Sequence, residues 1–385
     1  MKKSLIALAA LAAAGAASAQ SSVTLFGIVD VNYAHYSVGS GITTVNTSAG
    51  PAGTAIGGQH ANVLTNSGYN SARLGFRGTE DLGGGLAASF WLEGALAPDN
   101  GNASGLTFQR RSTVSLSGGW GEVRLGRDYV PTFWNLTVFD PFGTNGVGTV
   151  VGFKAKTTTL AATNNPYGSV GGVAVAANDP HAVRSDNMVQ YFLPANLGGF
   201  YGQISYAFDE STANNAGEYL GGRLGFASGP FNVAAAFGKT KGAEPNTPAV
   251  PEVRTWNVGG QWDFGMAKLL GQYDHTKYDI GTGEAALKSW LIGGLIPVGA
   301  GEIRISYSRT KLNDTGSNEP EASQWALGYV HNLSKRTALY ATYAHLKNKD
   351  GGALPIQASL PQATVLPGTV NTSSSGVDIG IRHSF

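Results

Sequence analysis

Most of the chain alternates apolar and polar residues with a period of two, which is the pattern of a β-strand with one apolar face. In the last segment, the odd-numbered positions from Val377 to Phe385 are mostly apolar, and the even-numbered positions from Asp378 to Ser384 form the opposite face. Residues 86–93 and 111–117 repeat this alternation. Helices repeat about every 3.6 residues instead, so the pattern predicts an all-β fold.

About sixteen segments follow this pattern, a number within the range of outer-membrane barrels. Their approximate cores begin at Val23, Arg73, Leu86, Gln109, Glu122, Arg184, Phe200, Glu218, Phe231, Arg254, Ala267, Ala285, Glu302, Ser323, Thr337 and Gly376. Short turns are found at 81–85, 118–121, 195–199, 228–230 and 332–336, and long polar stretches at 37–70, 128–183 and 348–375. A transmembrane barrel with tight periplasmic turns and long outer loops has this asymmetry. A soluble sandwich has no reason to show it.

Composition narrows the class of protein further. Only 13% of the 385 residues are charged, about half the share in an ordinary soluble domain. The net charge of +1 argues against a nucleic-acid partner, and the absence of Cys excludes disulfides and thiolate metal sites. Aromatic residues in or beside the strands suit the interfacial girdles of a barrel, with core aromatics of a soluble sandwich as the alternative.

The first 19 residues have the features of a secretory signal peptide. Lys2 and Lys3 form a basic start, residues 5–14 form a short apolar core, and residues 17–19 are small. The apolar core is too short to span a membrane, since spanning takes about 20 residues. We therefore predict export of the protein and a single mature domain at 20–385.

Several stretches resemble the trimeric general diffusion porins of Gram-negative outer membranes, especially the betaproteobacterial branch. The resemblance rests on residues 22–27, 121–127 and 380–385, and on the run RLGFRGTEDLGGGL that begins at Arg73. It implies a sixteen-stranded antiparallel transmembrane β-barrel, assembled as a homotrimer with one pore per subunit. It also implies that the third long loop, at about 128–183, folds into the lumen and narrows the pore.

The resemblance further implies the location, the partners and the activity. The barrel would lie in the bacterial outer membrane among lipid and lipopolysaccharide, and the segment ending at Phe385 would be recognised by the barrel-assembly machinery. The expected function is passive diffusion of ions and small hydrophilic solutes through a water-filled channel. The alternatives are a substrate-preferring porin, a barrel adhesin or enzyme acting through its outer loops, and a secreted sandwich that binds polysaccharide.

Alternation predicts a basic wall in the lumen. Arg73, Arg111 and Arg184 each lie near the start of a segment that follows a long stretch. If the long loops are outside, these three side chains lie at similar depth, and Arg77 lies lower on the same wall. The resemblance agrees, because porins of this class carry a basic cluster that faces the inserted loop. Such a wall sorts small ions by charge, although simple hydration of the lumen or pairing with the loop is an alternative role.

Two carboxylates are candidates for the acidic side of the constriction. Asp140 lies in the third loop at a place where the resemblance implies an acid that faces the arginines, and Glu93 shares the lumen face with Trp91. Alternation places Arg127 on the apolar face of its segment. That face would point toward lipid, where an arginine is costly. We therefore predict Arg127 at a strand end or at a subunit contact, where it is paired.

The sequence favours neither an enzyme nor a cofactor-binding protein. The histidines show no metal-ligand spacing, and no phosphate-binding or catalytic motif is present, so we expect no metal, cofactor or catalysis. The arginine wall favours anions locally, whereas the mature net charge favours neither sign, so the ion preference stays open.

Overall fold

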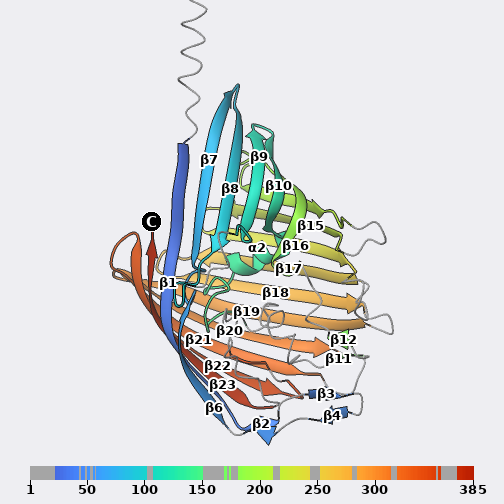
Figure 1. The fold of residues 1–385 in the computed structure, drawn as a ribbon, viewed down its shortest axis with the longest axis vertical. Helices are drawn as coiled ribbons and strands as arrows, with labels where there is room; N and C mark the ends of the chain where they lie inside the picture. The colour runs from blue at the N-terminus through green and yellow to red at the C-terminus, as the bar shows by residue number, and fades with distance from the viewer. Residues whose placement is uncertain are drawn as a thin grey trace, which may run out of the picture.

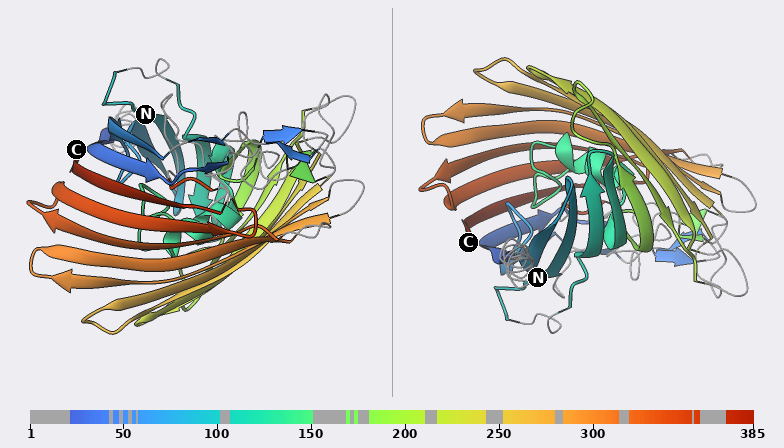
Figure 2. Two further views of the ribbon diagram at one scale, coloured as in Figure 1. Left: turned by 90° about the horizontal axis from the view of Figure 1, so that it is seen from below. Right: turned by 90° about the horizontal axis from the view of Figure 1, so that it is seen from above.

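The computed structural model describes residues 22–42, 45–47, 50–52, 55–56, 58–101, 107–150, 169–170, 173–174, 181–210, 217–242, 252–279, 284–313, 319–352, 354–356 and 371–385. Nearly all of them lie in one large antiparallel sheet that closes on itself (Figures 1 and 2). Its strands are β1 (Ser22–Val38), β6 (Gln59–Asn66), β7 (Arg73–Gly83), β8 (Leu86–Ala95), β9 (Arg111–Gly118), β10 (Gly121–Tyr129), β13 (Arg184–Phe192), β14 (Phe200–Ala207), β15 (Tyr219–Ser228), β16 (Phe231–Lys241), β17 (Glu252–Asp263), β18 (Lys268–Asp279), β19 (Glu284–Val298), β20 (Gly301–Asn313), β21 (Glu321–Asn332), β22 (Thr337–Lys349) and β23 (Ser373–Ser384).

The first strand closes the ring. One edge of β1 pairs with β23, from Ile28 opposite Ser384 to Val38 opposite Ser374. Its other edge pairs first with β7 and then with β6, so these two strands share one position in the ring. The result is a closed sixteen-stranded antiparallel barrel, as predicted. A closed barrel also excludes the sandwich, because a sandwich has two separate sheets.

Most strands start close to the residues that alternation predicts, including Arg73, Leu86, Arg184, Phe200, Phe231 and Thr337. The prediction is wrong for 37–70, which was expected to be one long loop, because β1 continues to Val38 and β6 occupies 59–66. The sequence of β6 hides this strand, since polar His60 and Asn62 share a face with Leu64. The small strands β2 (Gly41–Ile42), β3 (Val45–Thr47), β4 (Gly50–Ala52), β5 (Ala55–Ile56), β11 (Ser169–Val170) and β12 (Val173–Ala174) form three separate hairpin-like pairs.

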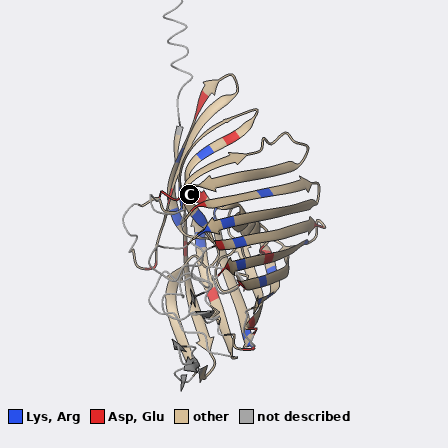
Figure 3. Cartoon of the chain, turned by 90° about the vertical axis from the view of Figure 1, so that its right-hand side faces the viewer, with Lys and Arg blue, Asp and Glu red and all other residues tan. Residues whose placement is uncertain are grey.

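The two faces of the barrel differ in polarity. Apolar and aromatic side chains such as Trp256, Ile292 and Trp325 point outward and are exposed. Side chains on the opposite face, such as Asn257 and Gln324, are polar and buried. Charged residues are sparse along the strands on the side shown in Figure 3. A barrel with an apolar exterior and a polar interior suits a bilayer with a hydrated lumen.

Some aromatic residues depart from the expected girdle. Trp256, Trp290 and Trp325 lie outward as predicted, whereas Tyr340 is buried and its hydroxyl donates a hydrogen bond to Asp30. Trp91 lies on the inward face beside Glu93. Alternation places both Tyr340 and Trp91 on the inward face of their strands, so the girdle expectation was too broad for these two rings.

Helix α2 (Pro131–Val138) lies inside the ring of strands in both views of Figure 2. Pro131 is its first residue, where the fixed φ of proline favours helix initiation. Inward side chains of the wall hold it: Asn257 donates to the carbonyl of Thr132 at 3.0 Å, and Gln272 donates to the carbonyl of Leu136 at 3.3 Å. No helix in the described part of the chain is both long enough and apolar enough to cross a membrane.

Candidate functional site

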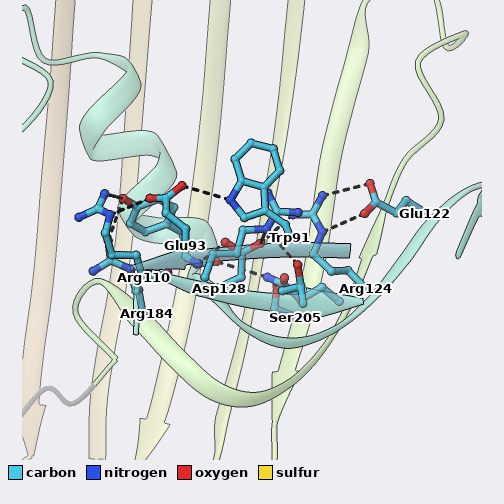
Figure 4. A network of polar contacts seen from close by, with 12 residues as sticks. Trp91, Glu93, Arg110, Glu122, Arg124, Asp128, Arg184 and Ser205 are labelled. Carbon is cyan, nitrogen blue, oxygen red and sulfur yellow. Dashed lines mark hydrogen bonds and ion pairs between the residues drawn. The ribbon is translucent and has the colours of Figure 1, made fainter. Parts of the chain in front are cut away.

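The predicted arginines lie on alternate strands of one wall, with β8 and β10 between them. Arg73 starts β7, Arg111 starts β9 and Arg184 starts β13. Arg77 lies four residues farther along β7, on the same inward face. Figure 4 shows the polar network that forms around this wall. The structure therefore brings all four residues to the interior, although only three of them join through hydrogen bonds or ion pairs.

Glu93 of β8 lies at one end of this network. Its Oε1 accepts a hydrogen bond from Nε of Arg110 at 2.7 Å and lies 3.5 Å from Nη1 of Arg73. Its Oε2 accepts a hydrogen bond from Nε1 of Trp91 at 3.1 Å. One carboxylate thus fixes two guanidinium groups and an indole ring. The predicted acid of the wall is therefore part of the arginine cluster and does not lie opposite it.

Arg110 was not predicted, although it is central to the cluster. Its Nη2 donates to the hydroxyl of Tyr129 at 2.9 Å, and the same hydroxyl accepts a hydrogen bond from Nη2 of Arg184 at 2.9 Å. The guanidinium of Arg184 also lies 4.4 Å from the centre of the Tyr129 ring. The predicted segment begins at Gln109, so alternation would give Arg110 the same face as Ser112 and Val114. In the structure β9 begins only at Arg111, and Arg110 turns inward because it lies outside the strand.

Asp128 forms a second centre on the same wall, and it too was not predicted. Its Oδ2 accepts a hydrogen bond from Nη1 of Arg124 at 2.7 Å and lies 3.5 Å from Nε of Arg111. Arg124 also donates two hydrogen bonds to Glu122, at 2.9 and 3.0 Å. The pairing of β10 with β13 shifts between Gly126 and Asp128, and this irregularity lies next to the cluster.

Trp91 separates two of the cations. The guanidinium of Arg111 lies 4.6 Å from the centre of the indole ring, and that of Arg77 lies 5.1 Å from it. Such cation–π contacts are worth about 0.5–2 kcal/mol each. These residues border an open cavity of about 400 Å³ that Glu122 and Arg124 also line. The ring holds both cations at the cavity without neutralising them.

The structure does not bring Asp140 to the arginine cluster through any described hydrogen bond or ion pair. Its carboxylate accepts hydrogen bonds from the backbone N–H groups of Phe142, Thr144 and Val150, at 2.9, 3.1 and 3.1 Å. Burial raises the pKa of Asp140, although these N–H groups and the charge of Arg304 lower it. Asp140 thus organises the segment after α2 from within.

Arg127 and Phe385 make no described hydrogen bond or ion pair with a member of the cluster. Arg127 is near the end of β10, where it pairs with Asp186 at 2.6 Å and donates to the carbonyl of Gln109. The backbone of Phe385 exchanges hydrogen bonds with Gly27 at 3.1 and 3.2 Å, so it belongs to the seam of the barrel. Recognition of Phe385 by the assembly machinery stays a prediction.

The cluster carries more positive than negative groups. Its described members are six arginines (Arg73, Arg77, Arg110, Arg111, Arg124 and Arg184) and three carboxylates (Glu93, Glu122 and Asp128). Three positive charges therefore remain on this wall. An excess of one sign on a lumen wall attracts ions of the other sign.

A family model described as Gram-negative porin matches residues 5–351. The chain belongs to the Gram-negative porin family. This porin is 44% identical to outer membrane porin protein 32 of Delftia acidovorans, over the full length of both chains. It is also 30% identical to an outer membrane porin protein of Bordetella pertussis, again over both full lengths.

Solved structures support the same assignment. The porin matches an anion-selective porin from Comamonas acidovorans with a TM-score of 0.75 and 40% identity, covering 95% of this chain and 100% of that chain. It shares the fold of OmpT from Vibrio cholerae, with a TM-score of 0.63 and 14% identity, over 95% and 98% of the two chains. The porin is thus an outer-membrane protein that forms a water-filled channel for passive diffusion.

Proposed function

We propose that this porin prefers anions and that the arginine cluster sets this preference. The proposal rests on the excess of three positive charges on one wall of the lumen. The related porin from Comamonas acidovorans is described as anion-selective, which supports the same reading here. General diffusion remains our proposal over uptake of one solute class, because the cavity beside Trp91 is open and polar.

The arrangement of cations suits passage better than tight binding. Arg73 and Arg77 are four residues apart on β7, which is about 13 Å along a strand. Glu93 and Asp128 each lie between two arginines, so an entering anion meets partly balanced charge at both places. A conducting site must attract ions without holding them. A series of sites along the wall, each attracting an anion only moderately, meets this requirement.

We also propose that α2 and the residues up to Val150 narrow the channel. The inward side chains Asn257, Gln272 and Gln324 all donate hydrogen bonds to backbone carbonyls of this segment. Contacts with β17, β18 and β21 fix the segment across a wide part of the wall. The proposed loop of 128–183 is described only in part, and the residues after Val150 lie largely outside the described ranges.

Reversal potentials in planar bilayers test the ion preference. Under a KCl gradient, the wild type should give a potential of the sign expected for anions. Arg73→Ala with Arg111→Ala should move the permeability ratio several-fold toward cations. Arg77→Ala removes a cation that has no ion pair with a described residue, so it tests the charge without breaking a pair. Arg336→Ala, in an exposed short turn, is the control.

If both lumen variants keep the wild-type reversal potential, the arginine cluster does not set selectivity. If the wild type itself prefers cations, the proposed preference is wrong, whereas the channel function stands. Absence of any conductance from folded protein would instead favour a barrel adhesin or enzyme. Family membership supports a channel, and we propose that the protein has no catalytic activity and needs no cofactor.

We propose a homotrimer that assembles through the wall around β1, β7, β8 and β9. The described outward positions of these strands are mostly apolar and include Glu80 but no Lys or Arg, whereas β16–β20 carry outward cations such as Lys239 and Lys288. A related fold, OmpT of Vibrio cholerae, is described in a trimer form. Val114→Arg on β9 should convert the trimer to monomers on unheated gels, whereas Ile292→Arg on β19 should not. The same oligomeric state for both variants would contradict the proposal that these four strands form the trimer interface.

Residues 1–19 lie outside the described residues, and we propose that they form the signal peptide that exports the chain. Amino-terminal sequencing of protein from outer membranes tests this directly. A mature start at Gln20 would support cleavage after Ala19.

A further inference from the structure

The outer face of β20–β23 contains an apolar groove of about 420 Å³. Ala341 is exposed in it, and the side chains around it are larger: Ile303, Leu327, Tyr329, Tyr343 and Ile379. Ala341 lies opposite Tyr329 in one neighbouring strand and opposite Ile379 in the other. A small residue between large ones leaves a furrow that an alkyl chain can fill.

Polar groups follow the groove toward the ends of the strands that join long loops. Nδ1 of His345 lies 2.8 Å from Oγ of Ser375, and the hydroxyl of Tyr343 donates to the same Oγ at 3.3 Å. Trp325 packs beside both, with its ring centre 5.1 Å from that of Tyr343. Aromatic and polar side chains at one level mark the boundary between hydrocarbon and headgroups.

Cations lie beyond this boundary. Ser323 of β21 is opposite Arg309 on one side and Lys347 on the other, so the two cations flank it. Arg309 pairs with Glu321. Lys347 is exposed and has no ion pair with a described residue. Two cations on a lipid-facing wall, one of them unneutralised, suit a phosphate ligand.

The spacing of groove and cations fits the outer leaflet of a bilayer, with the groove in the hydrocarbon and the cations among the headgroups. Ala341 and Lys347 are six residues apart, about 20 Å along a strand. With a strand tilt of about 40°, the distance along the membrane normal is about 15 Å. The boundary marked by His345 and Ser375 lies four residues from Ala341, about 10 Å along the membrane normal, so the groove lies within the outer half of the hydrocarbon core, which is about 15 Å thick.

We propose that this wall binds lipopolysaccharide, with a phosphate at Lys347 and Arg309, sugar hydroxyls at Ser375 and His345, and an acyl chain in the Ala341 groove. The site rests on the orientation of the porin with its long loops outside, which places Lys347 in the outer leaflet. Lipopolysaccharide is the phosphorylated, sugar-bearing lipid of that leaflet. The row of hydroxyl and imidazole groups between groove and cations favours it over an anionic phospholipid.

Native mass spectrometry of protein purified in mild detergent tests the site by titration with purified lipopolysaccharide. Lys347→Gln removes the phosphate partner, and Ala341→Leu fills the groove. Each should weaken lipopolysaccharide binding about 10-fold, Lys347→Gln because the phosphate loses a charged partner and Ala341→Leu because the larger side chain occupies the space of the acyl chain. A tenfold loss of affinity is about 1.4 kcal/mol. Lys335→Gln in the short turn of the same hairpin and Ala235→Leu on β16 are matched controls, because both residues are exposed but lie outside the site.

Equal lipopolysaccharide affinity in all five proteins would overturn the site. Phosphatidylglycerol that binds equally well and depends equally on Lys347 would overturn the choice of lipopolysaccharide. Loss of oligomers in Ala341→Leu would show that a second subunit covers the groove, which also overturns the proposal. Heat-modifiable gel mobility checks folding, and conductance is recorded in parallel, so failure of the lipid site is separable from failure of the channel function.

Discussion

The carboxylate of Asp378, on β23, accepts a hydrogen bond from the backbone N–H of Val147 at 2.8 Å, although the two residues are 231 positions apart in the chain. The other carboxylate oxygen accepts a hydrogen bond from the amide of Asn32 at 3.1 Å. Asp378 therefore connects the segment after α2 to both strands of the barrel seam. This contact suggests how the segment resists displacement.

Asp378→Ala should loosen that segment, because the N–H of Val147 loses its hydrogen-bond acceptor. A buried donor left without its partner costs about 1–3 kcal/mol. We expect more frequent spontaneous closures and a lower voltage for closure in single-channel records. Asp263→Ala, in an exposed short turn, is the control. Identical gating in both variants would show that this contact does not hold the segment.

Trp91→Leu should reduce anion preference without removing any charge. The indole ring holds Arg77 and Arg111 at the open cavity, and its loss lets both guanidinium groups move toward nearby carboxylates. We expect a smaller change in reversal potential than for the arginine variants. Trp120→Leu tests a ring that is exposed beside a short turn. A larger effect from Trp120→Leu would contradict this account.

Gly126→Ala should destabilise the barrel at the arginine wall. Gly126 has a φ of +118°, and a Cβ there would lie 2.1 Å from the carbonyl oxygen of Ser112. Strain of this kind costs about 1–3 kcal/mol. The thermal unfolding midpoint should therefore fall. Gly119→Ala in the adjoining turn meets no atom within 4 Å and should leave the midpoint nearly unchanged.

The stability of the segment around Asp140 should decrease as the pH rises. Its pKa in the folded protein is above the ordinary 3.8, so the folded state binds a proton more tightly than the unfolded state. The contribution is greatest below 3.8 and is lost as the pH rises through the raised pKa. Amide exchange at Val150, corrected for the intrinsic rate, should speed up over this window. Asp140→Asn should remove the dependence, and an unchanged slope would exclude Asp140 as its source.

Arg127→Gln should leave oligomers intact. Arg127 pairs within its own chain with Asp186, which is 65% exposed, and exposed pairs contribute about 0–1 kcal/mol. Unheated gels should show the wild-type species, with only a small fall in the unfolding midpoint. Dissociation into monomers would place Arg127 at a subunit contact instead.

Strand positions were predictable because a barrel wall separates lipid from water, so every second residue reports its face. Arg73, Arg77, Arg111 and Glu93 follow that rule and lie inward as expected. The rule fails where the backbone leaves the strand. Alternation counted from Gln109 would point Arg110 outward, but Arg110 precedes β9 and turns inward. Asp140 folds into local backbone contacts, so its position could not be obtained from alternation.

Long-range contacts were beyond the sequence pattern for a related reason. Asp378 appears in the sequence as one polar residue among several on its strand, and nothing near it identifies Val147 as a partner. The break between β6 and β7 depends on Asp30, whose carboxylate accepts the N–H groups of Tyr69 and Asn70. Such contacts depend on which distant segments meet after the ring closes.

The seam between β1 and β23 also constrains how the chain can fold. Asn32 and Asp378 bond across it although they are 346 residues apart, so the ring cannot close until the last strand has been synthesised and exported. Until then β1 has an unpaired edge, which is prone to pairing with other chains. Contacts of such high sequence separation form slowly. A nascent chain of this porin therefore needs protection from aggregation for nearly its whole synthesis, and a truncation that removes only β23 would leave two open edges.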